Sequence, residues 1–572
     1  MSPQYPTSPD PGPGRRPSRA VPVPVPVREQ RFAHPLSFWA GAAACTAGVL
    51  LHLPMYYSAR GMHYAMAGMR PDAAMLAGMA AIAAGLGLVL YGLLPGRSGQ
   101  SARAATRISV RALDDAPITR RHVAMLVALA LAVTIDVMKP TTLSFVAPGM
   151  AHEYGLLSPT NPHGHGSVAW LPLTGISGTV VGSCLWGALG DRIGRRAAIM
   201  FAGMLFVTTS ICGAMPGYGW NLLMCFLMGI AAGGMLPIAF ALMAETVPAR
   251  HRGWIMVLIG GDIAGAYVAT SWLAAELTPT YSWRILWLIG LPTGLLFIAL
   301  THWIPESPRF LLARGRRAEA EVVMARYGAR AEEADGRGAA AGSPGPGDPV
   351  GGADRWTARG GYLRLFRRPF AAPTLAITVL GLGLGLITYG FQQWVPTNLQ
   401  HLGYSAVGSD YVVRNAALLG LPVTGLVAWM YGVWGSRRTI VTVSALTAVA
   451  LAGFVVGGDS LAHRRALLSL LLVVPLSGVS SAVAVLAGYA AEVYPTRIRA
   501  RGAGLAAGMT KAGGVLILAV VVAGRVPSIA VTALIGAVPL LAAAVCFVWA
   551  GPETRRRRLE DITGELLPGL RV

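Results

Sequence analysis

Four residues of ionisable types stand inside long apolar stretches of this sequence. Asp136 and Lys139 lie three residues apart in "TIDVMKPTTLSF" (134–145), Asp262 lies in "GWIMVLIGGDIAGAYVAT" (253–270), and Lys511 lies in "AAGMTKAGGVLILAV" (506–520). Among the 47 Lys and Arg residues of the chain, these two are the only lysines. A charge at the middle of an apolar helix costs about 2.5–3.5 kcal/mol on insertion scales, so such residues usually face a cavity or a partner.

The chemistry available to these four residues is proton transfer or the binding of a carboxylate. A desolvated lysine or carboxylate changes its proton affinity readily. Asp136 and Lys139 share a helix face at i,i+3, so they could also form a self-neutralising pair that only makes the helix insertable. Lys511 and Asp262 have no opposite charge within one turn, and we expect each to find a partner on another helix.

A second polar group occurs in "ITYGFQQWVPTN" (387–398). Gln392, Gln393 and Trp394 offer donors, acceptors and a stacking face, which are typical of a site for a small polar molecule. The alternative is that the glutamines bridge helices. Arg414 lies near the outer end of the next apolar stretch and could bind an anion or reach the membrane surface.

The elements that position these residues must be membrane-spanning helices. The chain has 572 residues, is 54% hydrophobic and only 13% charged, and has a mean hydropathy of +0.54; soluble proteins carry about twice that charged fraction. The net charge is +21, but the arginines that carry it lie between apolar stretches and not on one basic face, which argues against nucleic-acid binding. The five cysteines have no paired spacing, and neither a metal site nor a cofactor is indicated.

A spanning helix needs about 20 mostly apolar residues, and fourteen segments qualify. Arginines collect in every second connection, which predicts that both termini are cytoplasmic. The expected spans are 37–57, 73–95, 122–149, 167–190, 197–215, 219–244, 253–276, 284–304, 371–396, 411–434, 439–457, 466–491, 502–524 and 527–550.

The last twelve spans form two related halves. "AETVPARHRG" (244–253) matches "AEVYPTRIRA" (491–500), and "PESPR" (305–309) matches "PETRR" (552–556), both at an offset of 247 residues. A common offset indicates an internal duplication, which is typical of transporters that rock two halves around a central site. The predicted organisation is a disordered Pro/Arg-rich tail (1–36), an extra hairpin (37–96), a linker (97–121), two six-helix bundles (122–304 and 371–550), a cytoplasmic loop between them (305–370) and a C-terminal tail (551–572).

The loop "GALGDRIGRR" (187–196), with "YSWRILWLIGLP", "PESPRFLL" and the closing "PET", resembles the signature of the major facilitator superfamily. The resemblance covers about 120–560 and is closest to the branch of sugar porters and metabolite:proton symporters. It implies an all-α fold of two six-helix bundles, here with two additional N-terminal helices. The residues after the glutamine pair, Trp394-Val395-Pro396, depart from the sugar-porter pattern, which disfavours a sugar substrate.

The resemblance also implies a cytoplasmic gate of charged residues that breaks when the halves rock, with Gly190 and Gly194 allowing a tight turn. The alternative is that the arginines only fix topology. The second copy of the loop, "YGVWGSRRT" (431–439), has Gly432 in place of the aspartate, so a weaker latch is expected there. The gate residues are Gly190, Asp191, Arg192, Gly194, Arg195, Arg196, Glu245, Arg250, Arg252, Glu492, Arg497 and Arg499.

These observations predict a secondary active transporter, not an enzyme, that takes up a small anionic or polar metabolite with protons by alternating access. Asp136 is assigned to proton coupling with Lys139 and Asp262, and Lys511 to an anionic group of the substrate, with Gln392, Gln393, Trp394 and Arg414 as further substrate contacts. A proton-driven exporter and a transport-inactive nutrient sensor are the alternatives. The expected partners are the substrate, protons and the lipid bilayer of the plasma membrane, for a monomeric protein.

Overall fold

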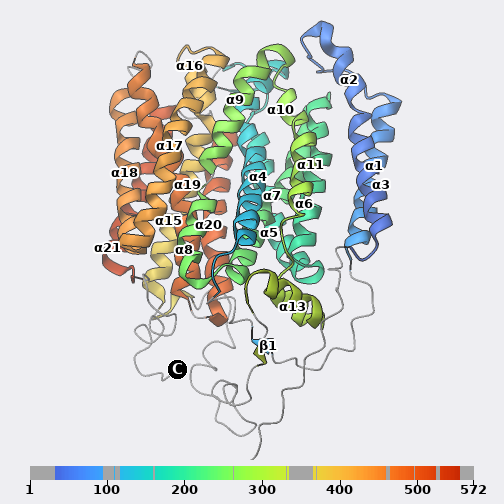
Figure 1. The fold of residues 1–572 in the computed structure, drawn as a ribbon. Helices are drawn as coiled ribbons and strands as arrows, with labels where there is room; N and C mark the ends of the chain where they lie inside the picture. Colours follow the sequence, from blue (N-terminus) through green and yellow to red (C-terminus); the bar gives the residue numbers. More distant parts are fainter. Residues whose placement is uncertain are drawn as a thin grey trace, which may run out of the picture.

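The helices of the computed structural model run side by side, with their long axes nearly parallel (Figure 1). The structure describes residues 32–94, 108–109, 116–158, 161–261, 263–329, 332–333, 365–368, 370–458, 464–494, 496–523 and 528–553. Most of the predicted tails, of the linker 97–121 and of the loop 305–370 lies outside these ranges, as does Asp262.

The N-terminal part contains a helical pair followed by the first half of the bundle. Asp72 caps helix α3 by accepting a hydrogen bond from Met75 N at 2.7 Å. Thr119 and His122 form a reciprocal capping box at the start of helix α4. The elements are α1 (Pro35–Leu50), α2 (Leu53–Ser58), η1 (Ala59–Met62), α3 (Ala73–Leu93), α4 (Arg120–Glu153), α5 (Trp170–Ile193), α6 (Arg195–Thr209), η4 (Ser210–Ala214), α7 (Tyr218–Thr246), α8 (Ala249–Gly260), α9 (Ile263–Tyr281), α10 (Ile285–Leu288) and α11 (Gly290–Leu300).

The second half of the bundle repeats this arrangement after two short helices below the membrane-spanning part. Strand β1 (Ile108–Ser109) pairs antiparallel with β2 (Glu332–Glu333) beneath the bundle. The remaining helices are α12 (Pro308–Ala313), α13 (Arg317–Arg326), α15 (Ala371–Gly390), η6 (Gln392–Trp394), α16 (Val395–His401), α17 (Ala406–Trp434), α18 (Ser436–Gly457), α19 (Arg465–Val493), α20 (Thr496–Ala523) and α21 (Ile529–Ala550).

Counted over the described residues, twelve helices are long and apolar enough to cross a membrane. The count of about fourteen is therefore not confirmed, nor is the reading of the N-terminal pair as an addition to twelve other spans. Segment 284–304 falls short because its helix, Ile285–Leu300, is too short to be counted. Segment 167–190 forms α5, in which some side chains lie outside the description. The twelve include Pro35–Met62 and Ala73–Leu93. The prediction of an all-α membrane protein is confirmed.

Helices α1 and α3 pack tightly against each other and lie beside α6 at the edge of the bundle (Figure 1). Close packing is possible because glycines face each other: a Cβ on Gly78 would lie 2.7 Å from the carbonyl oxygen of Gly48. The two halves of the bundle meet where α9 and α8 contact α17, where α5 contacts α20, and where α4 contacts α16. Helix α4 thus lies at the interface between the halves, which is where Asp136 is found.

Candidate functional site

Asp136 is buried in α4 and faces the other half of the protein. Its side chain is 2% exposed, and its Oδ1 has no hydrogen-bond partner in the part of the chain that the structure describes. An electrostatic interaction links it to Lys511 of α20. Pro140 follows four residues later and lacks an N–H, so the backbone carbonyl of Asp136 also loses its usual helical partner.

Lys511 reaches across from the second half to the first. Its Nζ donates a hydrogen bond to Ser183 Oγ and lies 3.4 Å from the carbonyl oxygen of Thr179, both on α5. Ser183 Oγ in turn donates to the carbonyl of Gly233 at 2.9 Å. Lys511 thus finds hydrogen-bond partners on another helix, α5, as expected. These contacts join the second half of the bundle to the first.

Lys139 points away from Asp136, into the interior of the first half. Among the described residues no ion pair joins the two, and Lys139 Nζ has no hydrogen-bond partner although the side chain is only 4% exposed. The ammonium lies against the backbone of Gly290, and a side chain at that position would overlap it. The geometry therefore does not support a self-neutralising pair, because the Lys139 ammonium lies at Gly290 and makes no ion pair with Asp136 among the described residues.

The polar group at η6 and α16 divides into residues with and without partners. Gln392 Nε2 donates to the carbonyl oxygens of Pro475 at 2.7 Å and Leu476 at 3.3 Å on α19, so this glutamine bridges helices. Gln393 Nε2 and Trp394 Nε1 are buried without partners in the described structure, and so are Thr397 Oγ1 and Asn398 Nδ2.

Thr397 and Asn398 were not singled out from the sequence. Thr397 follows Gln393 by four residues, and Asn398 follows Trp394 by four residues. This spacing places side chains on one helical face, so it could have indicated that Thr397 and Asn398 belong to the same polar group. Both η6 and α16 contact α4. These unpartnered donors therefore lie along the same interface between the halves as Asp136.

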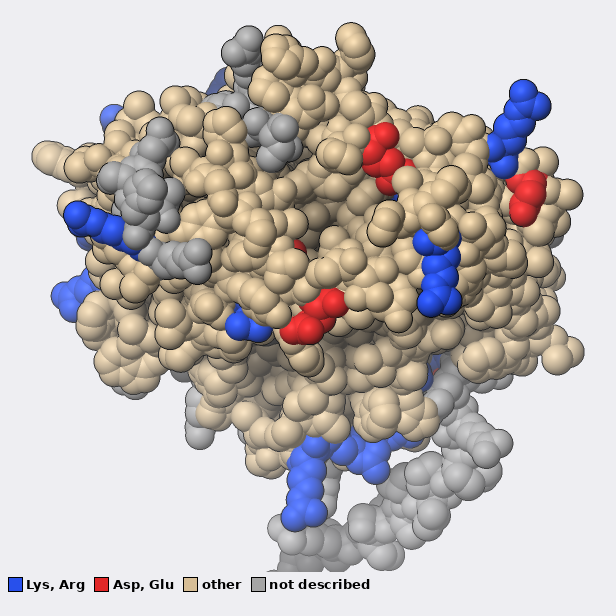
Figure 2. All heavy atoms as spheres, turned by 90° about the horizontal axis from the view of Figure 1, so that it is seen from above, with Lys and Arg blue, Asp and Glu red and all other residues tan. Residues whose placement is uncertain are grey.

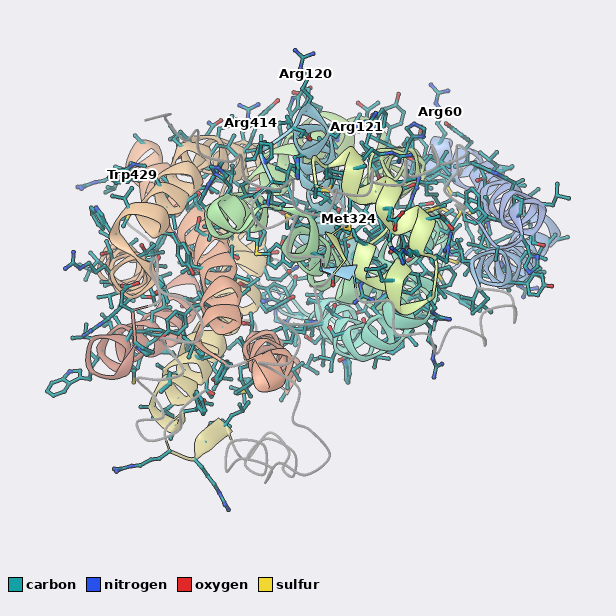
Figure 3. The ribbon with its side chains drawn as sticks, turned by 60° about the horizontal axis from the view of Figure 1, so that its bottom comes forward. Arg60, Arg120, Arg121, Met324, Arg414 and Trp429 are labelled. Carbon is teal, nitrogen blue, oxygen red and sulfur yellow. The ribbon has the colours of Figure 1, made fainter. Side chains whose placement is uncertain are left out.

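Arg414 is not part of this interior group. Its guanidinium donates to Asn415 Oδ1 at 3.2 and 3.0 Å and lies 4.4 Å from the centroid of the Tyr411 ring. Figure 3 shows Arg414 at the periphery of the bundle. Arg414 is half-buried at this periphery, which agrees with the alternative expectation that it reaches the membrane surface.

At the opposite end of the first half, Glu306 of "PESPR" caps helix α6. Its Oε1 accepts hydrogen bonds from Arg195 N at 2.8 Å and Ser307 N at 3.0 Å. Burial raises the pKa of Glu306 to about 7, although these backbone donors and the Arg195 charge oppose that rise. Gly194, at φ 103° and ψ 160°, makes the turn that brings these groups together.

Gly190 does not share that role. It lies within helix α5, where its carbonyl accepts from Gly194 N at 3.1 Å and from Arg195 NH1 at 3.0 Å. The expectation that both glycines form the tight turn is therefore wrong for Gly190, because α5 continues to Ile193 and the chain turns only at Gly194.

Other gate residues lie around Glu306. Glu245 accepts a hydrogen bond from Ser307 Oγ and lies 3.9 Å from Arg195 NH2. Arg192 is exposed and its carbonyl accepts from Arg314 NH2 at 2.5 Å, whereas Arg196 is buried. The side chains of the remaining predicted gate residues lie outside the described part of the structure: Asp191, Arg250, Arg252, Glu492, Arg497 and Arg499.

The second half builds the same cap from the matching motif. Glu553 of "PET" accepts from Ser436 N at 2.9 Å and from Ser436 Oγ at 3.1 Å at the start of α18. Gly435 makes the turn at φ 98° and ψ 169°. The sequence repeat at an offset of 247 residues is thus matched by a repeated structure, in which a glutamate caps a helix that begins after a glycine turn.

Comparison with known proteins identifies the family of this chain. Residues 124–519 match the family model described as Major Facilitator Superfamily. The chain belongs to the major facilitator superfamily. It is a multi-pass membrane protein and a secondary transporter of small organic metabolites rather than an enzyme, which confirms the prediction from its motifs.

Curated relatives of this superfamily member include two bacterial transporters. The "Niacin transporter NiaP" of Acinetobacter baylyi is 27% identical over 462 residues, covering 79% of this chain and 99% of the relative. The "4-hydroxybenzoate transporter PcaK" of Pseudomonas putida is 25% identical over 419 residues, covering 71% and 86%. Among solved structures, the proton:xylose symporter XylE bound to 6-bromo-6-deoxy-D-glucose superposes with a TM-score of 0.58 at 19% identity, covering 78% of this chain and 98% of XylE. This likeness shows a common fold.

Proposed function

We propose that this superfamily member imports a small aromatic carboxylate together with protons, by alternating access. One observation carries the proposal: Asp136 is buried on α4 at the interface between the halves, and Lys511 of the other half reaches across that interface to Ser183. A proton acceptor and a cation at such an interface can be loaded from one side and released to the other when the halves rock.

The substrate class is inferred from the charge of Lys511 and from the relatives. Niacin and 4-hydroxybenzoate each consist of one aromatic ring bearing a carboxylate, and these are the compounds in the names of two relatives. An ammonium group binds a carboxylate through charge-assisted hydrogen bonds. The same ammonium contacts Ser183 and Thr179, which are neutral partners that an anion can displace.

The unpartnered donors at η6 and α16 support a polar substrate at this interface. Gln393, Trp394, Thr397 and Asn398 are buried with polar atoms that no described residue satisfies. An unmade hydrogen bond of a buried group costs about 1–3 kcal/mol. A substrate hydroxyl or ring nitrogen that accepts from these donors recovers that cost, so we assign Gln393 and Trp394 to substrate contact and Gln392 to helix bridging.

The roles of Asp136 and Lys511 can be separated in proteoliposomes with radiolabelled nicotinate and benzoate as probes. For Asp136→Asn we expect no proton-driven accumulation but retained counterflow exchange, because exchange needs no net proton movement. For Lys511→Ala we expect both activities to be lost, with partial recovery in Lys511→Arg. Accumulation by Asp136→Asn equal to that of the unmodified protein would refute the coupling role, and an unchanged KM in Lys511→Ala would refute the binding role.

We further infer that both termini are cytoplasmic and that the membrane is the plasma membrane. The support is the arginine-rich character of alternate connections, since positive charge is retained on the cytoplasmic side. Arg120 and Arg121 begin α4, at the end of the helix that this orientation makes cytoplasmic. A reporter that is active only in the cytoplasm, fused to the C-terminus, should be active, and an inactive but membrane-inserted fusion would contradict the orientation.

A further inference from the structure

The segment between η1 and α3, residues 63–72, lies on the predicted outer end of the first half and is held there by Glu153. Glu153 Oε1 accepts hydrogen bonds from Met66 N at 2.8 Å and Ala67 N at 3.0 Å. The same carboxylate is paired with Arg284 NH2 at 2.6 Å and accepts from Trp283 Nε1 at 3.0 Å. Because Arg284 is fully buried, this segment is anchored to the interior of the bundle and not only to its surface.

Aromatic contacts fix the course of the same segment. Tyr56 donates to the carbonyl of Tyr281 at 2.7 Å, and its ring stacks on that of Tyr64 with centroids 4.6 Å apart. His63 and Tyr64 have φ values of 52° and 59°, a left-handed conformation that bulky residues rarely adopt. The surrounding contacts hold this strained turn, which buries Tyr64.

The segment forms one wall of a cavity of about 930 Å³. A second wall comes from the first half, at His152 and Trp283, and a third from the second half, at Asp410 of α17. Figure 2 shows that this face is hollowed near its middle and carries few charged residues. A volume of this size suits a small organic molecule.

The basic residues of the cavity, with Arg60 as its fixed positive charge, favour an anion at its rim. Arg60, His63 and His152 are exposed and line the cavity, whereas Asp410, the one acidic side chain among the described residues of its lining, is buried. Arg60 makes no hydrogen bond or ion pair with another described residue, and Figure 3 shows it projecting at the edge of the bundle. An arginine in this position can bind a carboxylate with two parallel hydrogen bonds.

Aromatic side chains complete the chemistry. Tyr64 and Trp283 line the cavity and give its wall an aromatic surface beside Arg60. We propose that this cavity is a second binding site for a small aromatic carboxylate, built in part by the N-terminal helical pair, where the substrate binds before it reaches Lys511. The identity of the ligand rests on the proposed function, whereas the site itself rests on the cavity and its charged rim.

Counting bound ligand per chain tests this proposal on the full-length protein in nanodiscs, with radiolabelled benzoate as the probe. We expect two sites per chain. Lys511→Ala should leave one site, and adding Arg60→Gln and His152→Gln should weaken that remaining site by roughly tenfold or more. Arg70→Gln is the matched control, because Arg70 is an exposed arginine of the same segment that does not line the cavity.

A Lys511→Ala protein that binds no benzoate would overturn the proposal, and so would a remaining site that is unaffected by the Arg60 and His152 substitutions. Uptake kinetics give a second readout: Arg60→Gln should raise KM at unchanged kcat, since it acts before the central site. Failure of the proposed function looks different, because proton-driven uptake would then persist in Asp136→Asn or Lys511→Ala whatever the number of sites.

Discussion

Replacing Gly194 by alanine tests the cap that joins "GDRIGRR" to "PESPR". A Cβ at this position would lie closer to Glu306 Oε2 than any real Cβ approaches such an atom, and the φ of 103° is one that only glycine adopts easily. Holding alanine in such a conformation costs about 1–3 kcal/mol. Displacing Glu306 weakens its hydrogen bonds from Arg195 N and Ser307 N, each worth about 0.5–1.5 kcal/mol. The expected destabilisation is therefore about 2–6 kcal/mol.

Thermal unfolding of the purified protein measures this loss, with Gly190→Ala as the matched control. Gly190 is helical and a Cβ there would meet only Ile238, at 3.9 Å. Alanine is favoured over glycine in a helix by about 0.5–1 kcal/mol. We expect Gly194→Ala to lower the melting temperature clearly and Gly190→Ala to leave it equal or slightly higher. Equal melting temperatures for Gly194→Ala and the unmodified protein, or a larger loss in Gly190→Ala, would refute the reasoning.

Three further predictions concern buried polar groups. Burial raises the pKa of Glu306 from 4.5 to about 7, so the folded protein holds the carboxyl proton more tightly than the unfolded chain. The stabilisation from this bound proton is complete below pH 4.5 and is lost as pH rises through 7. Glu306→Gln should remove this pH dependence from thermal melting curves. Arg284→Met should destabilise by about 3–5 kcal/mol, measured by thermal unfolding, because it strands the Glu153 carboxylate, and a Glu153→Gln, Arg284→Met double variant should recover part of the loss. Gln392→Leu should lower the melting temperature because it removes two hydrogen bonds to α19, whereas Gln393→Leu should mainly raise the KM for uptake; the opposite pattern would exchange their roles.

Several parts of the site were open to prediction because they are local in sequence. Gly194 and Gly435 follow an apolar span and precede arginines, a pattern that indicates a turn between two helices. Asp136 and Lys511 stand out because ionised groups are rare in apolar stretches. The repeat of "PESPR" as "PET" at a constant offset was equally visible, although the capping role of Glu306 and Glu553 was not.

The partners of these residues were not open to prediction in the same way. Lys139 lies one turn from Asp136 in sequence, yet it packs against Gly290, about 150 residues away. Residues three apart lie on the same side of a helix, but this spacing does not specify which neighbours each side chain contacts. It therefore could not predict that Asp136 and Lys139 have different surroundings. For the same reason it did not decide which of Gln392 and Gln393 bridges to α19.

The sequence by itself determined that this chain is an all-α membrane transporter with duplicated halves, because apolar length, arginine placement and a constant repeat offset are properties of the linear chain. Only the tertiary structure decided that Lys511 contacts Ser183 on the opposite half, and that the segment after η1 is anchored by Glu153 over an outer cavity. Those contacts join residues far apart in sequence. Their geometry depends on how the helices pack, which the spacing of residues along one helix does not specify.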